Sequence, residues 1–290
     1  MVRPSLAVVI CLVLLSGCST LSAPNTATTS PELSETPTVS EPVTSTPTQT
    51  ETPETHTRPP GVISSDVSEP FTLAQAHVEA LQTSYTVTQR YEVRFANGTL
   101  YTSEVVRVAV AENEATYQVE TTVRGSRPRF LGTDNGTRKS AVFSDGSTVF
   151  RRTEYGGVTQ YAGPYNENER VPPEAAYQGT PRNEERIPIL FGQLSNVSVI
   201  RHGDGFYRIR GTPSRDTVEV SGVQVSNVTV GEFTATVTSD GLVWEYLLTA
   251  RGTVNDQDVM VTEQVRYSAI GSTSVEEPPW YDDAVGNTTG

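Results

Sequence analysis

Lysine is nearly absent from this chain. Lys139 is the only one among 290 residues, so arginine supplies almost all of the 21 basic side chains, against 34 acidic ones and a formal net charge of −13. Surface carboxylates hold water and salt ions, and salt screens their mutual repulsion. The composition favours a high-salt organism, with an ordinary acidic protein as the alternative. It also predicts no basic stripe, which argues against nucleic acid as a partner.

Cysteine is almost as scarce, and both copies lie near the N-terminus. After Arg3, the run Leu6 to Leu15 is apolar but shorter than the roughly 20 residues that span a bilayer. It therefore resembles the apolar region of a signal peptide. The run ends in Ser16-Gly17-Cys18, the pattern of a lipobox. We expect a signal peptide over residues 1–17, a lipid on Cys18 and a place on the extracellular face of the cell membrane; an uncleaved N-terminal helix is the alternative. Removal of Cys11 with the signal leaves no partner for an intramolecular disulfide.

Aromatic residues are missing between the signal and Phe71. Residues 18–60 are mostly Thr, Ser, Pro and Glu, so they cannot bury enough apolar surface to offset their ordering entropy. We expect a disordered stalk of the O-glycosylated kind behind the lipidated Cys18. Asn-x-Ser/Thr sequons follow in the exported part, and some of them are expected to carry N-glycans: Asn97, Asn135, Asn196, Asn227 and Asn287.

Signatures of catalysis are missing too. The sequence has no Gly-x-Ser-x-Gly elbow, no Walker loop and no dinucleotide fingerprint. The three histidines, His56, His77 and His202, lie far apart in sequence, and no cysteine joins them as a metal ligand. His77 fits a packed helix residue better than a catalytic base, and His202 begins a glycine-rich turn. The sequence therefore predicts a non-enzymatic protein without catalytic residues, metal or cofactor.

A period of two in hydrophobicity dominates residues 61–284. From Tyr85 to Phe95 the odd positions are apolar or aromatic except Gln89, and Asn97-Gly98 then predicts a hairpin. Helix-period segments begin at Thr72, which has capping-box spacing, and near Pro188. The apolar parity flips at Gly231, which indicates a bulge. We predict a mainly β (α+β) fold: one large curved antiparallel sheet of about ten strands with an N-terminal and a short central helix on one face. A sandwich is the alternative, and residues 285–290 are expected to be a disordered tail.

The two ends of this domain carry a family resemblance. Pro59-Pro60-Gly61-Val62 and, near the C-terminus, Tyr267 to Gly271 with Pro278-Pro279-Trp280-Tyr281 resemble a group of haloarchaeal lipoproteins. Those proteins distantly resemble lipoprotein carriers of the LolA/LppX type, in which a curved sheet wraps around helices and leaves a cavity for an acyl chain or lipid. The resemblance implies that fold and no catalytic residues. It implies a cavity lining on one sheet face, for which a filled core is the alternative: Tyr91, Phe95, Tyr117, Val119, Trp244 and Tyr246.

Two functions remain open from the sequence. One is a carrier that binds a lipid, an isoprenoid or another apolar ligand at the membrane surface. The other is a structural or adhesive cell-envelope glycoprotein that engages another protein, whose identity the sequence does not give. The long polar segment 163–185 is expected to be a lid or contact surface, because long irregular loops in compact domains are often functional.

Overall fold

The computed structural model describes residues 58–125, 136–164, 181–214, 216–220 and 223–288. The expected signal peptide, Cys18, nearly all of the expected stalk, Asn135 and most of segment 163–185 lie outside the described residues, so the predictions made for them stay predictions.

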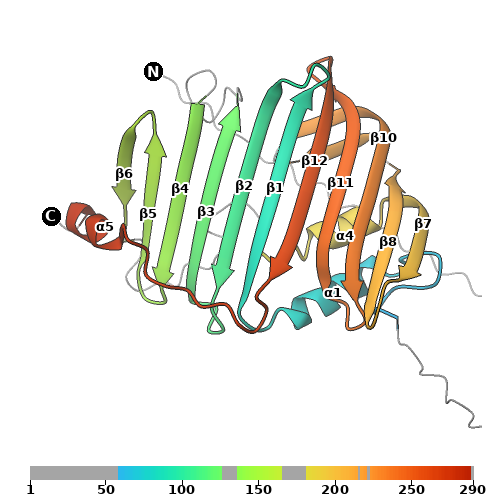
Figure 1. Ribbon diagram of the computed structural model, residues 1–290, viewed down its shortest axis with the longest axis horizontal. Coiled ribbons are helices and arrows are strands. Elements are labelled where there is room, and N and C mark those ends of the chain that lie inside the picture. Colours follow the sequence, from blue (N-terminus) through green and yellow to red (C-terminus); the bar gives the residue numbers. More distant parts are fainter. Residues whose placement is uncertain (1–57, 126–135, 165–180, 215, 221–222, 289–290) are drawn as a thin grey trace, which may run out of the picture. The chain divides into compact units, whose positions relative to one another are not determined.

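Twelve antiparallel strands form one sheet in the order β6-β5-β4-β3-β2-β1-β12-β11-β10-β8-β7, and β9 pairs with β10 beside this path (Figure 1). β6 and β7 end the path without pairing to each other, so the sheet is open. The predicted fold class is confirmed, with twelve strands in place of about ten. The strands are β1 Tyr85–Phe95, β2 Leu100–Val110, β3 Thr116–Gly125, β4 Gly136–Asp145, β5 Val149–Tyr155, β6 Val158–Ala162, β7 Leu194–Arg201, β8 Phe206–Pro213, β9 Thr217–Val220, β10 Val223–Thr238, β11 Val243–Val254 and β12 Gln257–Ser268.

The last strand joins the two halves of the sheet. β12 pairs with β1 from Thr86–Ser268 to Phe95–Val259, and on its other side with β11. Strands β1 to β6 form a meander on one side, and β7 to β11 lie on the other. The middle of the sheet is therefore built from residues about 170 positions apart in the chain.

Strand alternation gives the sheet two different faces. On β12 the odd positions, such as Val261 and Val265, are buried, while Met260 and Arg266 are exposed. We call the face of the odd β12 residues the inner face and the opposite one the outer face. The inner face carries the main hydrophobic core, which continues from β1 and β2 through Val108, Val119 and Val142.

Helices α1 (Pro70–Ala80) and α4 (Arg186–Phe191) contact each other and lie on the inner face (Figure 1). The start predicted for the first helix is wrong by about two residues: Pro70 occupies the first turn, where its missing N–H is harmless. Thr72 instead donates a side-chain hydrogen bond to Glu69 at 3.0 Å. α4 is anchored by Phe191, whose ring meets that of Phe233 edge-to-face at 5.1 Å.

A third helix, α5 (Tyr281–Thr288), packs on the outer face against β5 and β6 and against Phe143 of β4. Trp280 and Ala284 form a small separate core with Phe143 and Phe150, whose side chains alternate with the inner residues of the same strands. The disordered tail expected for 285–290 is therefore too long, because residues 285–288 belong to this packed helix.

Candidate functional site

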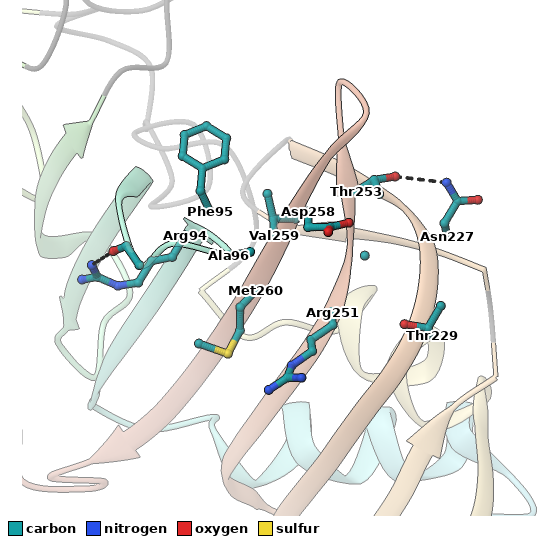
Figure 2. A pocket seen from close by; sticks show the side chains of 12 residues that line it. Arg94, Phe95, Ala96, Asn227, Thr229, Arg251, Thr253, Asp258, Val259 and Met260 are labelled. Carbon is teal, nitrogen blue, oxygen red and sulfur yellow. Dashed lines mark hydrogen bonds between the residues drawn. The ribbon is translucent and has the colours of Figure 1, made fainter.

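A pocket of about 530 Å³ opens near the β1–β2 turn (Figure 2). Its walls come from the ends of four strands that are neighbours in the sheet, β1, β12, β11 and β10. It is lined by Arg94, Phe95, Ala96, Gly98, Asn227, Thr229, Arg251, Gly252, Thr253, Asp258, Val259 and Met260.

Two irregularities in strand pairing accompany this hollow. The β1–β2 register shifts between Val93 and Arg94, and the β10–β11 register shifts between Ser226 and Val230. The bulge expected at Gly231 thus lies a few residues earlier, where Asn227 has a positive φ of 52°. Bulges bend a strand and increase its twist, which separates side chains that a regular ladder would hold together.

Gly252 permits the close approach of β10 and β11 at the pocket wall. A Cβ atom there would lie 2.5 Å from the carbonyl oxygen of Ser226 and 2.7 Å from a Val225 methyl carbon. Because the nearer atom belongs to the backbone, no side-chain rotation relieves the clash. The pocket wall therefore needs glycine at this position.

The lining combines apolar and cationic groups. Phe95 is half-buried and packs edge-to-face on Tyr101, with 5.4 Å between the ring centroids. The Met260 side chain is 46% exposed. The Arg94 guanidinium is held by Glu92 at 2.6 Å and by the carbonyl of Gly98 at 2.9 Å. Arg251 is exposed and makes no hydrogen bond or ion pair with a residue in the described part of the chain. Met260 and Arg251 are paired neighbours on the outer face, so this side of the pocket can hold an amphiphile with its apolar part against Met260 and its charge near Arg251.

A buried polar cluster lies elsewhere, between the inner face and α4. The Glu263 side chain is fully buried and accepts hydrogen bonds from Arg186 Nε at 3.0 Å and from the Tyr246 hydroxyl at 2.8 Å. Arg186 Nη2 also contacts the second carboxylate oxygen and donates to the carbonyl of Glu219 at 3.0 Å. The ion pair ties the start of α4 to the centre of the sheet.

This cluster continues towards α1 through neutral groups. Asn183 donates to the Tyr267 hydroxyl at 2.8 Å, and that hydroxyl donates to the carbonyl of Pro181 at 3.0 Å. The ring of His77 meets that of Tyr267 edge-to-face at 4.8 Å, and its Nδ1 accepts from the Val243 N–H at 3.1 Å. These contacts connect both helices to the inner face.

Burial sets the protonation of this cluster. Burial raises the pKa of Tyr246, and the Glu263 carboxylate raises it further, so the phenol stays a donor. Burial alone would lower the pKa of Arg186, but Glu263 outweighs that effect and raises it. Burial lowers the pKa of His77 to about 3, although the main-chain carbonyl of Arg182 opposes the shift. The cluster therefore holds one charge pair and neutral partners near pH 7, an arrangement that suits a structural role.

The residues predicted to line a cavity are not gathered in one place. Phe95 lines the pocket. Tyr117, Val119 and Tyr246 are buried in the hydrophobic core of the inner face, while Tyr91 and Trp244 are half-buried and pack against it. Their role as a lining stays a prediction.

Asn97, Asn196, Asn227 and Asn287 are all exposed, so their use as glycan acceptors stays open. Asn227 also lines the pocket, and its Nδ2 donates to Thr253 Oγ1 at 3.1 Å. Glu184 and Glu185, an acidic pair in the sequence, directly precede α4. In the residues that the structure describes, no group of His, Cys, Asp and Glu is arranged to hold a metal ion.

Sequence reasoning missed the buried cluster, although one signal was available. Glu263 stands at an inner position between Val261 and Val265, where an acid is out of place unless it has a partner. That partner, Arg186, is 77 residues away, and no local pattern connects them.

No family model matches this sequence, and no match appears among curated proteins. Among solved structures, the chain is similar to LprF from Mycobacterium bovis, with a TM-score of 0.36, 14% identity and coverage of 74% of this chain and 99% of that one. The chain is also similar to the lipoprotein LppX from Mycobacterium tuberculosis, with a TM-score of 0.30, 9% identity and coverage of 71% of this chain and 97% of that one. A third similar structure is a DUF1329 family protein from Desulfovibrio piger, with a TM-score of 0.26, 10% identity and coverage of 73% of this chain and 95% of that one. The distant resemblance to the LppX type is thus found again, while the resemblance to haloarchaeal lipoproteins stays a prediction. Similarities this distant assign no function to the chain.

Proposed function

We propose that this chain is a membrane-anchored extracytoplasmic lipoprotein that binds a lipid or another apolar ligand without transforming it. The pocket beside the β1–β2 turn carries the proposal. Its volume of about 530 Å³ falls in the range of roughly 300–1,000 Å³ that small-molecule sites occupy.

The lining chemistry supports an amphiphilic ligand. Met260 offers apolar contact on the outer face, where Arg94 and Arg251 lie on either side of it, and Phe95 lines the pocket from the inner face. Glu92 already neutralises Arg94, whereas Arg251 has no such partner among the described residues. We expect one anionic or polar group of the ligand to meet Arg251 while its apolar part covers Met260.

The anchor in this proposal is the lipid on Cys18, and it rests on the sequence alone. Among the described residues, no helix is long and apolar enough to cross a membrane. The stalk over residues 18–60 would give the domain reach from the membrane surface.

Native mass spectrometry of the Cys18→Ser full-length chain tests ligand binding without a covalent lipid. We expect a lipid mass, either co-purified or acquired from a host lipid extract, that organic solvent releases. Met260→Glu, which places a charge in the pocket, should abolish it. Leu247→Glu is the matched control, because Leu247 is similarly exposed on the neighbouring strand but does not line the pocket. An apo mass in the parent chain after incubation with host lipids would reject the proposal.

A second candidate is an adhesive cell-envelope glycoprotein, which the exposure of all four described sequon asparagines favours. The two functions conflict at Asn227, because a glycan on a pocket-lining side chain would occupy the ligand's place. Glycopeptide mapping decides between them: full occupancy of Asn227 favours the adhesive function, and an unmodified Asn227 favours the ligand site.

A further inference from the structure

The outer face of the central strands gathers arginine side chains that lie far apart in the sequence. Arg107 of β2 and Arg266 of β12 both pair with Thr88 of β1, so all three side chains lie in one row of the outer face. Arg90, two residues beyond Thr88, points to the same side. The expectation that no basic stripe exists is therefore wrong, because pairing between distant strands creates one.

Further arginines extend this surface across the sheet. Arg251 pairs with Met260 of β12, which also pairs with Arg94 of β1. Arg210 of β8 pairs with Thr234 of β10, which is opposite the outward-facing Leu247. We define the basic face by these outward-pointing residues: Arg90, Arg94, Arg107, Arg208, Arg210, Arg251 and Arg266.

Several of these cations are not neutralised within the described part of the chain. Arg90, Arg107, Arg210 and Arg251 are exposed and form no hydrogen bond or ion pair with a described residue. Seven arginines face outward on β1, β2, β8, β10, β11 and β12 together, against four acids: Glu92, Glu232, Glu245 and Asp258. Glu120 of β3 is paired opposite Arg107 at the edge of this surface. A chain of net charge −13 thus has one face with an excess of positive charge.

Two large apolar side chains protrude among these arginines. Leu247 is 40% exposed and pairs with Gln264, which in turn pairs with Arg90. Met260 is 46% exposed and lies between Arg94 and Arg251 in the pairing order, as Figure 2 shows at the pocket. Apolar groups within a cationic surface suit an interface that is anionic at its surface and apolar beneath. A nucleic acid or an acidic polysaccharide offers no apolar layer for them.

We propose that the basic face docks on an anionic lipid bilayer, with its arginines on lipid phosphates and with Leu247 and Met260 between headgroups. Guanidinium groups bind phosphate oxygens in a bidentate manner, and one face of the sheet presents several of them at once. The inference rests on the proposed function, since Arg94, Arg251 and Met260 also line the pocket. Docking in this orientation turns the pocket mouth towards the lipids from which a ligand would come.

Vesicle co-sedimentation of the Cys18→Ser full-length chain tests the docking. The vesicles contain equal parts of phosphatidylglycerol and phosphatidylcholine, or phosphatidylcholine alone, in about 0.15 M salt, where charges still act over about 8 Å. We expect binding to the anionic vesicles only. Because each arginine near such a surface contributes about a fivefold factor, Arg90→Gln/Arg107→Gln should bind about 30-fold more weakly.

The matched control removes two arginines from the other side of the sheet. Arg138 pairs with Val123 and Arg201 with the buried Tyr207, so Arg138→Gln/Arg201→Gln lowers the net charge equally but leaves the basic face intact. Its vesicle binding should equal that of the parent. Equal binding by both double variants, or equal binding to neutral vesicles, would overturn the docking. So would retention on DNA or a sulfated polysaccharide without vesicle binding.

Failure of the docking can be told apart from failure of the ligand site. Arg90 and Arg107 do not line the pocket, so their double variant should keep the ligand mass in native mass spectrometry. A ligand mass without vesicle binding in the parent removes the docking alone. Charge-dependent vesicle binding without any ligand mass removes the ligand site and leaves the docking.

Discussion

The ion pair between Arg186 and Glu263 should make a large contribution to stability that depends on both partners being present. The Glu263 side chain is completely buried, and the Arg186 side chain is 25% exposed. Glu263→Leu leaves the guanidinium without its counter-charge and the Tyr246 hydroxyl without its acceptor. Breaking a buried pair costs about 3–5 kcal/mol. The residual exposure of Arg186 places the expected loss near the lower end, about 3 kcal/mol.

Replacing both partners should cost much less than the two single changes added together. Arg186→Met/Glu263→Leu removes both charges, so it leaves no ion in an apolar site, and such exchanges are often close to neutral. In this variant the carbonyl of Glu219 loses one donor and the Tyr246 hydroxyl loses its acceptor, which together add about 2 kcal/mol. We therefore expect a coupling free energy of at least about 2 kcal/mol in a double-mutant cycle.

Urea unfolding followed by tryptophan fluorescence measures these free energies of unfolding. Glu245→Leu on β11 is the control, because Glu245 is 41% exposed and lies 4.0 Å from Arg266. Glu245→Leu should lower the free energy of unfolding by less than about 1 kcal/mol, as is usual for exposed ion pairs. A loss below about 1 kcal/mol for Glu263→Leu, or strict additivity of the two single changes, would refute this account of the cluster.

Three other perturbations test the structure. Burial depresses the pKa of His77 to about 3, whereas an unfolded histidine titrates near 6.5. Neutral His77 therefore contributes fully to the stability of the folded state above pH 6.5. As pH falls below that value, the unfolded state gains a proton that the folded state does not, and the free energy of unfolding drops by about 2 kcal/mol between pH 6.5 and 5. His77→Asn should flatten that dependence in urea titrations at several pH values; an unchanged slope would assign it to other groups. Trp280→Ala removes the centre of the small outer core, where Arg152 lies 5.7 Å from the indole ring, so hydrogen exchange should rise in α5 while the amides of β1 and β12 stay protected. Loss of protection in those central strands would contradict a separate outer core. Gly252→Ala should cost about 1–3 kcal/mol and lower ligand occupancy, because its Cβ meets the Ser226 carbonyl; wild-type stability would show that β10 can move away.

Local signals predicted the individual strands well, because they depend on neighbours in sequence. The alternation from Tyr85 to Phe95 matches β1, and Asn97-Gly98 forms the turn that follows it. The segment at 281–288 escaped notice because its sequence, Tyr-Asp-Asp-Ala-Val-Gly-Asn-Thr, has almost no apolar face. Only Ala284 is buried, and its contact surface lies on strands about 140 residues earlier.

The candidate pocket could not be predicted in the same way. Of the six residues proposed as a lining, only Phe95 reaches it, because two bulges and the end of β12 decide which side chains meet there. The prediction that no basic stripe exists was wrong for a related reason. It rested on the net charge of −13, which does not show which arginines share one face of the sheet.

The sequence by itself determined the class of the fold, its hairpins and the character of each strand's two faces, since periodicity and turn chemistry act over a few residues. The prediction of a lipobox at Cys18 also rests on local sequence alone, because that pattern involves only neighbouring residues. Only the tertiary structure decided that β12 lies between β1 and β11, and this pairing creates the Arg186–Glu263 site, the pocket and the basic face. Each of them joins side chains from segments far apart in the chain, and contacts of that range follow from the packing of the whole sheet.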